Sequence, residues 1–169
     1  MKHALRGAVA AMDSIRRGPH HPGVGDRPRT LDELVAAAAA RIDRLEPRAA
    51  LAAMERGAVL VDVRSDTSRE RDGIVPGSLH IPRTVLEWRL AGEEEWRTPH
   101  VPGRTAQVVL LCEHGCSTVL AAATLVDLGF TRAGDVVGGF EAWRAAGLPV
   151  VPAPTPRPGG HPGLGPPDV

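Results

Sequence analysis

The chain has 169 residues, which is long enough for one domain with a buried core. Twenty basic and twenty acidic residues leave no net charge, and aromatic residues are few, so the sequence lacks the basic and stacking surfaces of a nucleic-acid-binding protein. Two cysteines are too few for a disulfide-stapled secreted domain, and no apolar run approaches the roughly 20 residues of a membrane helix. Arg6 and Asp13 interrupt the N-terminal segment and argue against a signal peptide, so we expect a cytoplasmic protein without nucleic-acid or membrane partners.

Both ends of the chain are predicted to be flexible. Residues 1–29 end in RRGPHHPGVGDRPR, and residues 152–169 are rich in Pro and Gly, a composition that cannot bury a core. Thr30 and Glu33 form a capping-box pattern, which predicts a leading helix over residues 30–42. A second helix is predicted in RAALAAMERG and is closed by Gly57.

The rest of the chain alternates between strand-like and helix-like segments. AVLVDVR is typical of a buried parallel strand, and DGIVPGSLHIP reads as turns with a short extended piece at residues 78–81. RTVLEWRLAG predicts a short helix, followed by a polar loop and a second strand, AQVVLLC. A buried helix in STVLAAATLVDLG, a third strand in AGDVVGG and a last helix in FEAWRAAG complete the series. This order predicts an α/β domain with a largely parallel sheet, spanning about residues 30–151.

Both cysteines lie in the short gap between the second strand and the buried helix. Cys112 ends the strand, and ligand sites of open parallel sheets lie just beyond such ends. Successive backbone N–H groups in a short loop before a helix favour a negative charge, and a thiolate is such a charge. Gly115 permits the backbone conformation of such a loop, while Ser117 and Thr118 can donate hydroxyl hydrogen bonds. The sequence therefore predicts an anion-binding loop around a nucleophilic Cys112.

Two other interpretations of these residues are open. A free cysteine often only packs in a core, although its position at a strand-to-helix corner favours a site. Cys112, His114 and Cys116 could also be metal ligands, but C-x-H-x-C places them too close together for the usual zinc spacing, and we expect neither a metal nor a cofactor.

Four segments, in this order, resemble motifs of the rhodanese-like domain family. LVDVRS resembles the first core strand of that family, and DGIVPGSLHIP resembles its G-x-I-P-G-A-x-x-I-P signature. VVLLCEHGCSTVLAAATLVDLGF resembles the active-loop segment, C-x-x-G-x-x-S followed by a helix. DVVGGFEAWRAAGLPV is similar to the closing L-x-G-G-x-x-x-W-x-x-x-G-x-P-V motif. The resemblance covers about residues 55–151 and implies a single rhodanese-like domain, with helices on both faces of a mostly parallel central sheet.

The resemblance implies a sulfurtransferase. Cys112 would take sulfane sulfur from a small-molecule donor, thiosulfate or a mercapto acid, and pass it as a persulfide to cyanide or a thiol, including a protein thiol. Residues 113–118 would form the anion-binding loop: Glu113, His114, Gly115, Cys116, Ser117 and Thr118. Asp62 and Arg64, at the end of the first core strand, would support the site.

The loop departs from the family pattern in its charge. Many members have an arginine five residues after the cysteine, where this chain has Ser117. Glu113 adds a negative charge beside the site, so a dianionic donor meets a less positive field. Arg64, Arg83 and Arg89 are candidates for supplying positive charge from other segments.

Two competing functions use the same loop. A cysteine phosphatase needs an arginine near the end of the loop to hold phosphate, and Ser117 and Thr118 stand there instead. A non-enzymatic persulfide carrier or thiol redox sensor could use Cys112 together with Cys116, which would act as a resolving thiol or would be a small loop residue without a role. The sequence names neither the physiological donor nor the acceptor.

Overall fold

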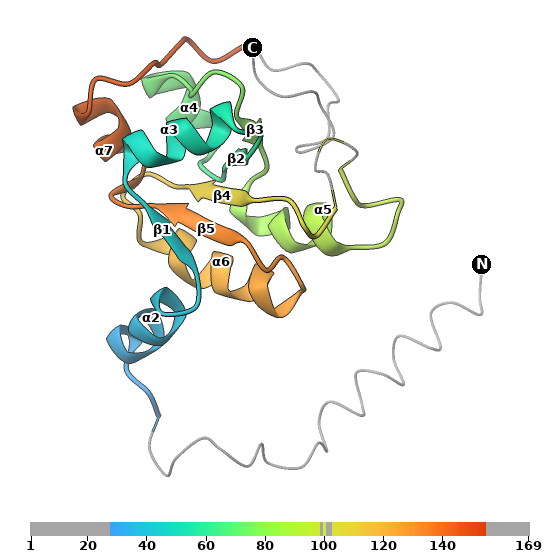
Figure 1. The fold of residues 1–169 in the computed structure, drawn as a ribbon. Coiled ribbons are helices and arrows are strands. Elements are labelled where there is room, and N and C mark those ends of the chain that lie inside the picture. Colours follow the sequence, from blue (N-terminus) through green and yellow to red (C-terminus); the bar gives the residue numbers. More distant parts are fainter. Residues whose placement is uncertain (1–27, 99, 101–102, 155–169) are drawn as a thin grey trace. The chain divides into compact units, whose positions relative to one another are not determined.

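A five-stranded sheet runs through the computed structural model, which describes residues 28–98, 100 and 103–154 (Figure 1). Its strand order is β1-β5-β4-β2-β3, and every neighbouring pair is parallel. The strands are Asp43–Leu45 (β1), Val59–Asp62 (β2), Leu79–His80 (β3), Val108–Leu111 (β4) and Ala133–Val136 (β5). The expected α/β fold with a parallel sheet is confirmed, whereas most of the two expected tails lies outside the described residues.

Helices cover both faces of this sheet, because its central strands are apolar on both sides. On one face lie α6 (Ser117–Asp127) and α5 (Leu86–Ala91), the latter preceded by the 3₁₀ turn η1 (Arg83–Val85), and α2 (Leu31–Ala39) packs against α6. On the other face lie α3 (Pro47–Glu55) and α7 (Gly139–Ala145), which pack against each other. The helix α4 (Asp66–Asp72) follows β2.

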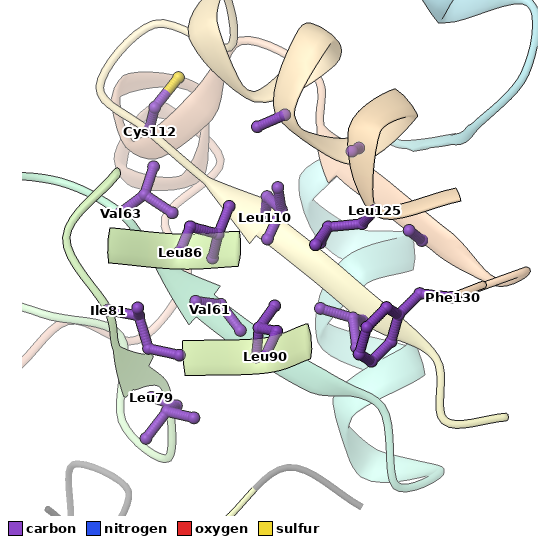
Figure 2. Close-up of a cluster of buried hydrophobic side chains, with 14 residues drawn as sticks. Val61, Val63, Leu79, Ile81, Leu86, Leu90, Leu110, Cys112, Leu125 and Phe130 are labelled. Atoms are coloured by element: carbon purple, nitrogen blue, oxygen red, sulfur yellow. The ribbon is translucent and has the colours of Figure 1, made fainter. Parts of the chain in front are cut away.

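Strand β4 shows how the two faces are built. Val108 and Leu110 belong to the buried cluster with α5 and α6, whereas Val109 and Leu111 belong to the cluster with α3 and α7. Successive side chains of a strand point to opposite faces, so this alternation is the expected result of a doubly covered strand. Cys112 continues the series Val108, Leu110 and belongs to the α6 cluster, at the carboxyl end of β4 (Figure 2).

Three elements differ from the sequence-based expectations. The leading helix ends at Ala39 rather than near residue 42, and β1 follows it and pairs with β5. Three mostly exposed residues in β1 give no apolar pattern, so only the pairing partner reveals the strand. The helix α4 was also missed, although Ser65 caps its first turn and accepts a hydrogen bond from the Ser68 N–H.

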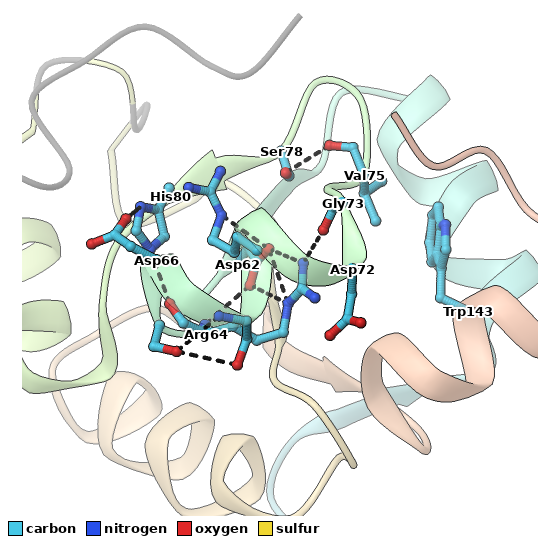
Figure 3. Close-up of polar contacts among 12 residues, drawn as sticks. Asp62, Arg64, Asp66, Asp72, Gly73, Val75, Ser78, His80 and Trp143 are labelled. Carbon is cyan, nitrogen blue, oxygen red and sulfur yellow. Dashed lines mark hydrogen bonds and ion pairs between the residues drawn. The ribbon is translucent and has the colours of Figure 1, made fainter. Parts of the chain in front are cut away.

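A buried ion cluster forms where β2 ends (Figure 3). The Asp62 carboxylate accepts hydrogen bonds from Nε of Arg64 at 3.0 Å and from its Nη2 at 2.7 Å, and Nε of Arg69 lies 3.4 Å away. Asp62 is fully buried, and Arg64 is 4% exposed. Arg64 also donates to the Gly73 carbonyl, and its guanidinium lies 3.5 Å from the centroid of the Phe140 ring. The cluster therefore links β2 and the end of α4 to the first turn of α7.

Asp62→Asn is expected to destabilise the fold by roughly 3–5 kcal/mol, because it leaves buried guanidinium groups without their compensating charge. Urea unfolding of the variant and the wild-type protein measures this difference. The matched control is Asp127→Asn, whose carboxylate pairs with Arg41 at the surface, where ion pairs contribute little. Equal stability of the two variants would contradict the structural role of Asp62.

Candidate active site

The Cys112 loop, residues 113–118, connects β4 to α6 and rests on the start of α7. The Phe140 N–H donates to the Cys112 carbonyl at 2.8 Å, and the Glu141 N–H donates to the Glu113 carbonyl at 3.1 Å. These two bonds hold the two peptide groups that follow Cys112. Arg64 packs on the Phe140 ring, so the buried ion cluster supports the turn that anchors the loop.

Two glycines, Gly115 and Gly139, allow the loop to approach the backbone at the start of α7. Gly115 has φ +72°, and a Cβ on it would lie 2.6 Å from the Gly138 nitrogen. A Cβ on Gly139 would lie 2.6 Å from the Gly115 nitrogen and 2.7 Å from the Glu113 oxygen. Because real side chains do not tolerate such contacts, residues 115 and 139 must both lack one for the two backbones to touch. A Cβ on Gly138 would instead lie 2.6 Å from the Cβ of Ala142 in α7.

Hydrogen-bond donors surround the Cys112 sulfur. The Gly115 N–H donates to Sγ at 3.1 Å, and the Thr118 hydroxyl lies 3.5 Å from Sγ. Burial raises the pKa of the Cys112 thiol, but hydrogen bonds from the side chains and backbone of Ser117 and Thr118 outweigh it. The net result is a pKa below that of an ordinary cysteine, which favours the nucleophilic thiolate.

The remaining predicted loop residues lie on the outside of the loop. The exposed thiol of Cys116 donates to the His114 carbonyl at 3.7 Å, and the His114 ring lies 3.3 Å from the Glu141 carboxylate. Glu113 is half-buried, and its Oε2 atom has no hydrogen-bond partner in the described part of the chain. Residues 113–118 therefore include one carboxylate, that of Glu113, and no Lys or Arg.

The three arginines considered as distant sources of positive charge are engaged elsewhere. Arg64 is bound to Asp62 inside the protein. Arg83 forms an ion pair with Glu87 at 2.8 Å, and Arg89 donates to the Trp96 carbonyl at 3.1 Å. No hydrogen bond or ion pair joins any of them to Cys112 within the described residues, and the Asp62–Arg64 pair meets the start of α7 through the packing of Arg64 on the Phe140 ring.

The sequence did not reveal two polar residues, Asp135 and Arg44, that are linked to the Cys112 sulfur through Thr118. Thr118 donates to the carboxylate of Asp135 at 3.2 Å, and Arg44 donates to the same carboxylate at 3.0 and 3.2 Å. An acidic residue inside the otherwise apolar strand segment AGDVV was an available signal, because a buried aspartate needs a partner. Arg44 gave no signal, since it lies in a strand that the sequence did not reveal.

Two further properties of the described residues concern metal ions and membranes. No group of three or more His, Cys, Asp or Glu side chains among them is placed to hold a metal ion. None of the helices in residues 28–98 and 103–154 is long and apolar enough to cross a membrane.

Comparison with known proteins identifies the family. The sequence profile of the rhodanese-like domain matches residues 46–146, and the chain belongs to this family. A thiosulfate sulfurtransferase GlpE from Pseudomonas savastanoi pv. phaseolicola is 37% identical over 102 residues, covering 60% of this chain and 87% of that protein. The GlpE of Pseudomonas syringae pv. syringae is 39% identical over 101 residues, covering 60% and 86%. Like these relatives, the chain is an enzyme of the rhodanese type, a sulfurtransferase.

Solved structures share the fold. A Rhodopseudomonas palustris protein of unknown function, described as a possible tyrosine phosphatase, aligns with a TM-score of 0.66 and 30% identity, over 80% of this chain and 100% of that one. The polysulfide-sulfur transferase homodimer of Wolinella succinogenes aligns with a TM-score of 0.58 and 27% identity, over 71% and 85%. The expected family and fold are thereby confirmed.

Thr118→Val is expected to raise the pKa of Cys112, because valine removes a hydroxyl that stabilises the thiolate. The pH–rate profile of Cys112 alkylation by iodoacetamide has its midpoint at the pKa of the thiol. At a pH below this midpoint, alkylation of the variant should be slower by about tenfold. The pH–rate profile is measured with Cys116→Ser as the background, so that one thiol reacts. A variant midpoint equal to that of the parent would show that the hydroxyl does not stabilise the thiolate.

Proposed function

We propose that the protein moves sulfane sulfur through a persulfide on Cys112, from thiosulfate or a mercapto acid to cyanide or a thiol. The observation that supports this most is the Cys112 sulfur itself. It lies at the carboxyl end of β4, 7% exposed, and receives the Gly115 N–H and the hydroxyls of the first turn of α6. This environment suits a sulfur that must be anionic both as attacking nucleophile and as leaving group.

The first half-reaction loads the enzyme. The Cys112 thiolate attacks the outer sulfur of thiosulfate, an Sγ–S bond forms, and the S–S bond of the donor breaks. Sulfite leaves with the bonding electron pair, so no external oxidant or reductant is needed. With 3-mercaptopyruvate, a C–S bond breaks instead, and the enolate of pyruvate takes a proton from water. Backbone N–H groups of the loop then face the anionic persulfide.

The second half-reaction returns the enzyme to its starting state. A cyanide ion or an acceptor thiolate attacks the outer sulfur, and the Cys112 thiolate leaves with the electron pair of the broken S–S bond. A low pKa makes this thiolate a good leaving group. Both cysteines are free in the structure, and we propose that the enzyme works in the reducing cytoplasm, where thiol acceptors are abundant.

The charge around the loop bears on the choice of donor. Glu113 follows the nucleophile directly, and Glu141 lies across the loop beside His114. Thiosulfate has two negative charges and 3-mercaptopyruvate has one, so these carboxylates oppose thiosulfate more strongly. We therefore propose that a mercapto acid is used at least as well as thiosulfate, although the named relatives are thiosulfate sulfurtransferases.

Phosphatase activity is the competing proposal that the Rhodopseudomonas palustris relative raises. A cysteine phosphatase holds the phosphate oxygens with a bidentate arginine, and residues 113–118 contain none. We expect no hydrolysis of p-nitrophenyl phosphate above that of Cys112→Ser. Turnover of that ester by the wild-type protein alone would favour a phosphatase.

The intact mass of the reduced protein tests the proposed function. Incubation with thiosulfate or 3-mercaptopyruvate should add one sulfur atom, which cyanide removes as thiocyanate. Cys112→Ser should gain nothing, whereas Cys116→Ser should load normally. No gain with either donor, together with loss of two hydrogens on mild oxidation in the wild-type protein only, would instead indicate a Cys112–Cys116 redox pair.

Glu113→Gln is expected to raise kcat/KM for thiosulfate by about three- to tenfold, because it removes one charge that repels the dianion. The gain for 3-mercaptopyruvate should be smaller, and added salt should reduce both gains. Asp127→Asn is the matched control, since Asp127 ends α6 about 15 Å along the helix from the loop. Equal gains for both donors would show that the charge of Glu113 does not discriminate between them.

A further inference from the structure

A polar group lies on the apolar sheet face that includes Cys112. Arg44 of β1, Asp135 of β5 and Leu110 of β4 are register partners across three parallel strands, so their side chains point to the same face. Cys112 follows Leu110 by two residues and shares this face. Asp135 is fully buried, so its carboxylate depends on the groups that contact it.

The contacts of Asp135 lead directly to the nucleophile. Its Oδ1 accepts from Nε of Arg44 at 3.0 Å, and its Oδ2 accepts from Nη2 of Arg44 at 3.2 Å and from the Thr118 hydroxyl at 3.2 Å. The same hydroxyl oxygen lies 3.5 Å from the Cys112 sulfur. Among the described residues, Thr118 is thus the link between a buried carboxylate and the sulfur, and it is itself buried.

A hydroxyl has one hydrogen, and here two acceptors compete for it. When Cys112 is a thiol, its S–H can donate to the Thr118 oxygen while Thr118 donates to Asp135. When Cys112 is a thiolate, Thr118 can stabilise it only by turning its hydrogen toward the sulfur. Asp135 then loses its hydrogen bond from Thr118.

We propose that Asp135 is a positioning residue that competes with the Cys112 sulfur for the Thr118 hydrogen, and that Arg44 makes it able to release this hydrogen. Arg44 keeps two hydrogen bonds to the carboxylate in either arrangement and neutralises its charge. Its side chain is 34% exposed, so it reaches the carboxylate from the surface of the sheet edge.

This competition affects the two half-reactions differently, a consequence that rests on the proposed sulfur transfer. Stronger donation from Thr118 stabilises the thiolate, which makes it a better leaving group and a weaker nucleophile. Once the persulfide forms, the inner sulfur no longer bears the charge, and the Thr118 hydrogen returns to Asp135. Asp135 therefore favours loading of the enzyme over its discharge.

The other charged or titratable groups of the loop and of the first turn of α7 are the same in the variants compared. They are Glu113, His114 and Cys116 of the loop and Glu141 of α7. The hydrogen bond to Asp135, and then the charges of Asp135, Cys116 and Glu46, raise the pKa of Arg44, which stays a cation throughout the range tested.

The test measures Cys112 alkylation against pH, without any sulfur donor, in the Cys116→Ser background. In Asp135→Asn, the new amide can donate to the Thr118 oxygen, which leaves the Thr118 hydrogen for the sulfur. The midpoint should move to lower pH, with an alkylation rate on the order of tenfold higher at a pH below it. Arg44→Met should move the midpoint the other way, with a rate about threefold lower, and Arg44→Lys should restore part of the difference.

A second set of variants tests the route through Thr118. In a Thr118→Val background, Asp135→Asn should change the rate by less than about twofold, because the link is missing. The exposed Arg41–Asp127 pair supplies matched controls, Arg41→Met and Asp127→Asn, which should leave the profile unchanged. An equal effect of Asp135→Asn with and without Thr118 would overturn the proposal in favour of a direct charge effect.

Persulfide formation and discharge are then measured separately by stopped flow at a pH above both midpoints. Asp135→Asn should slow loading per thiolate and speed discharge to cyanide. If circular dichroism shows that Asp135→Asn does not fold, Arg44→Met takes its place in the test. Arg44→Met should show the opposite changes, faster loading per thiolate and slower discharge to cyanide. An unchanged alkylation profile in the folded variants would refute the competition, whereas a shifted profile without persulfide would instead refute sulfur transfer.

Discussion

The contact between two glycine-containing backbone segments determines the geometry of the site. Gly115 of the Cys112 loop touches Gly138 and Gly139 at the start of α7, where a Cβ on any of the three would collide with neighbouring atoms. Only at this separation can the Phe140 and Glu141 N–H groups reach the carbonyls of Cys112 and Glu113. The loop is therefore shaped by backbone contacts, and its outward side chains can vary in charge without moving the sulfur.

Two buried carboxylates lie on opposite faces of the sheet near this contact and have different roles. Asp62 neutralises Arg64, whose guanidinium packs on the Phe140 ring and so stabilises the turn that anchors the loop. Asp135 is paired with Arg44 and is linked to the Cys112 sulfur through Thr118. Asp62 thus stabilises the position of the loop, and Asp135 affects the ionisation of the Cys112 sulfur. Both are costly to bury alone, and each has an arginine partner.

Much of the fold was predictable because its strands and helices have strong local patterns. The apolar segments around Leu60 and Leu110 and the helix after Cys112 were identified by periodicity, and four motifs in order indicated the family. The strand β1 and the helix α4 were missed, since short polar segments have no pattern of their own. Arg64 was only a candidate source of positive charge in the sequence, which did not indicate its burial against Asp62. That burial depends on the approach of α4 and α7.

The sequence alone determined the class of fold and the place of Cys112 in it, because a cysteine that ends an apolar strand and precedes a glycine-containing loop and a helix is a local arrangement. Only the tertiary structure decided which groups surround that sulfur. Arg44 and Asp135 lie 91 residues apart and meet through strand register, while Asp135 and Thr118 meet through the packing of α6 on the sheet. Such pairings depend on contacts between distant segments, which no local pattern encodes.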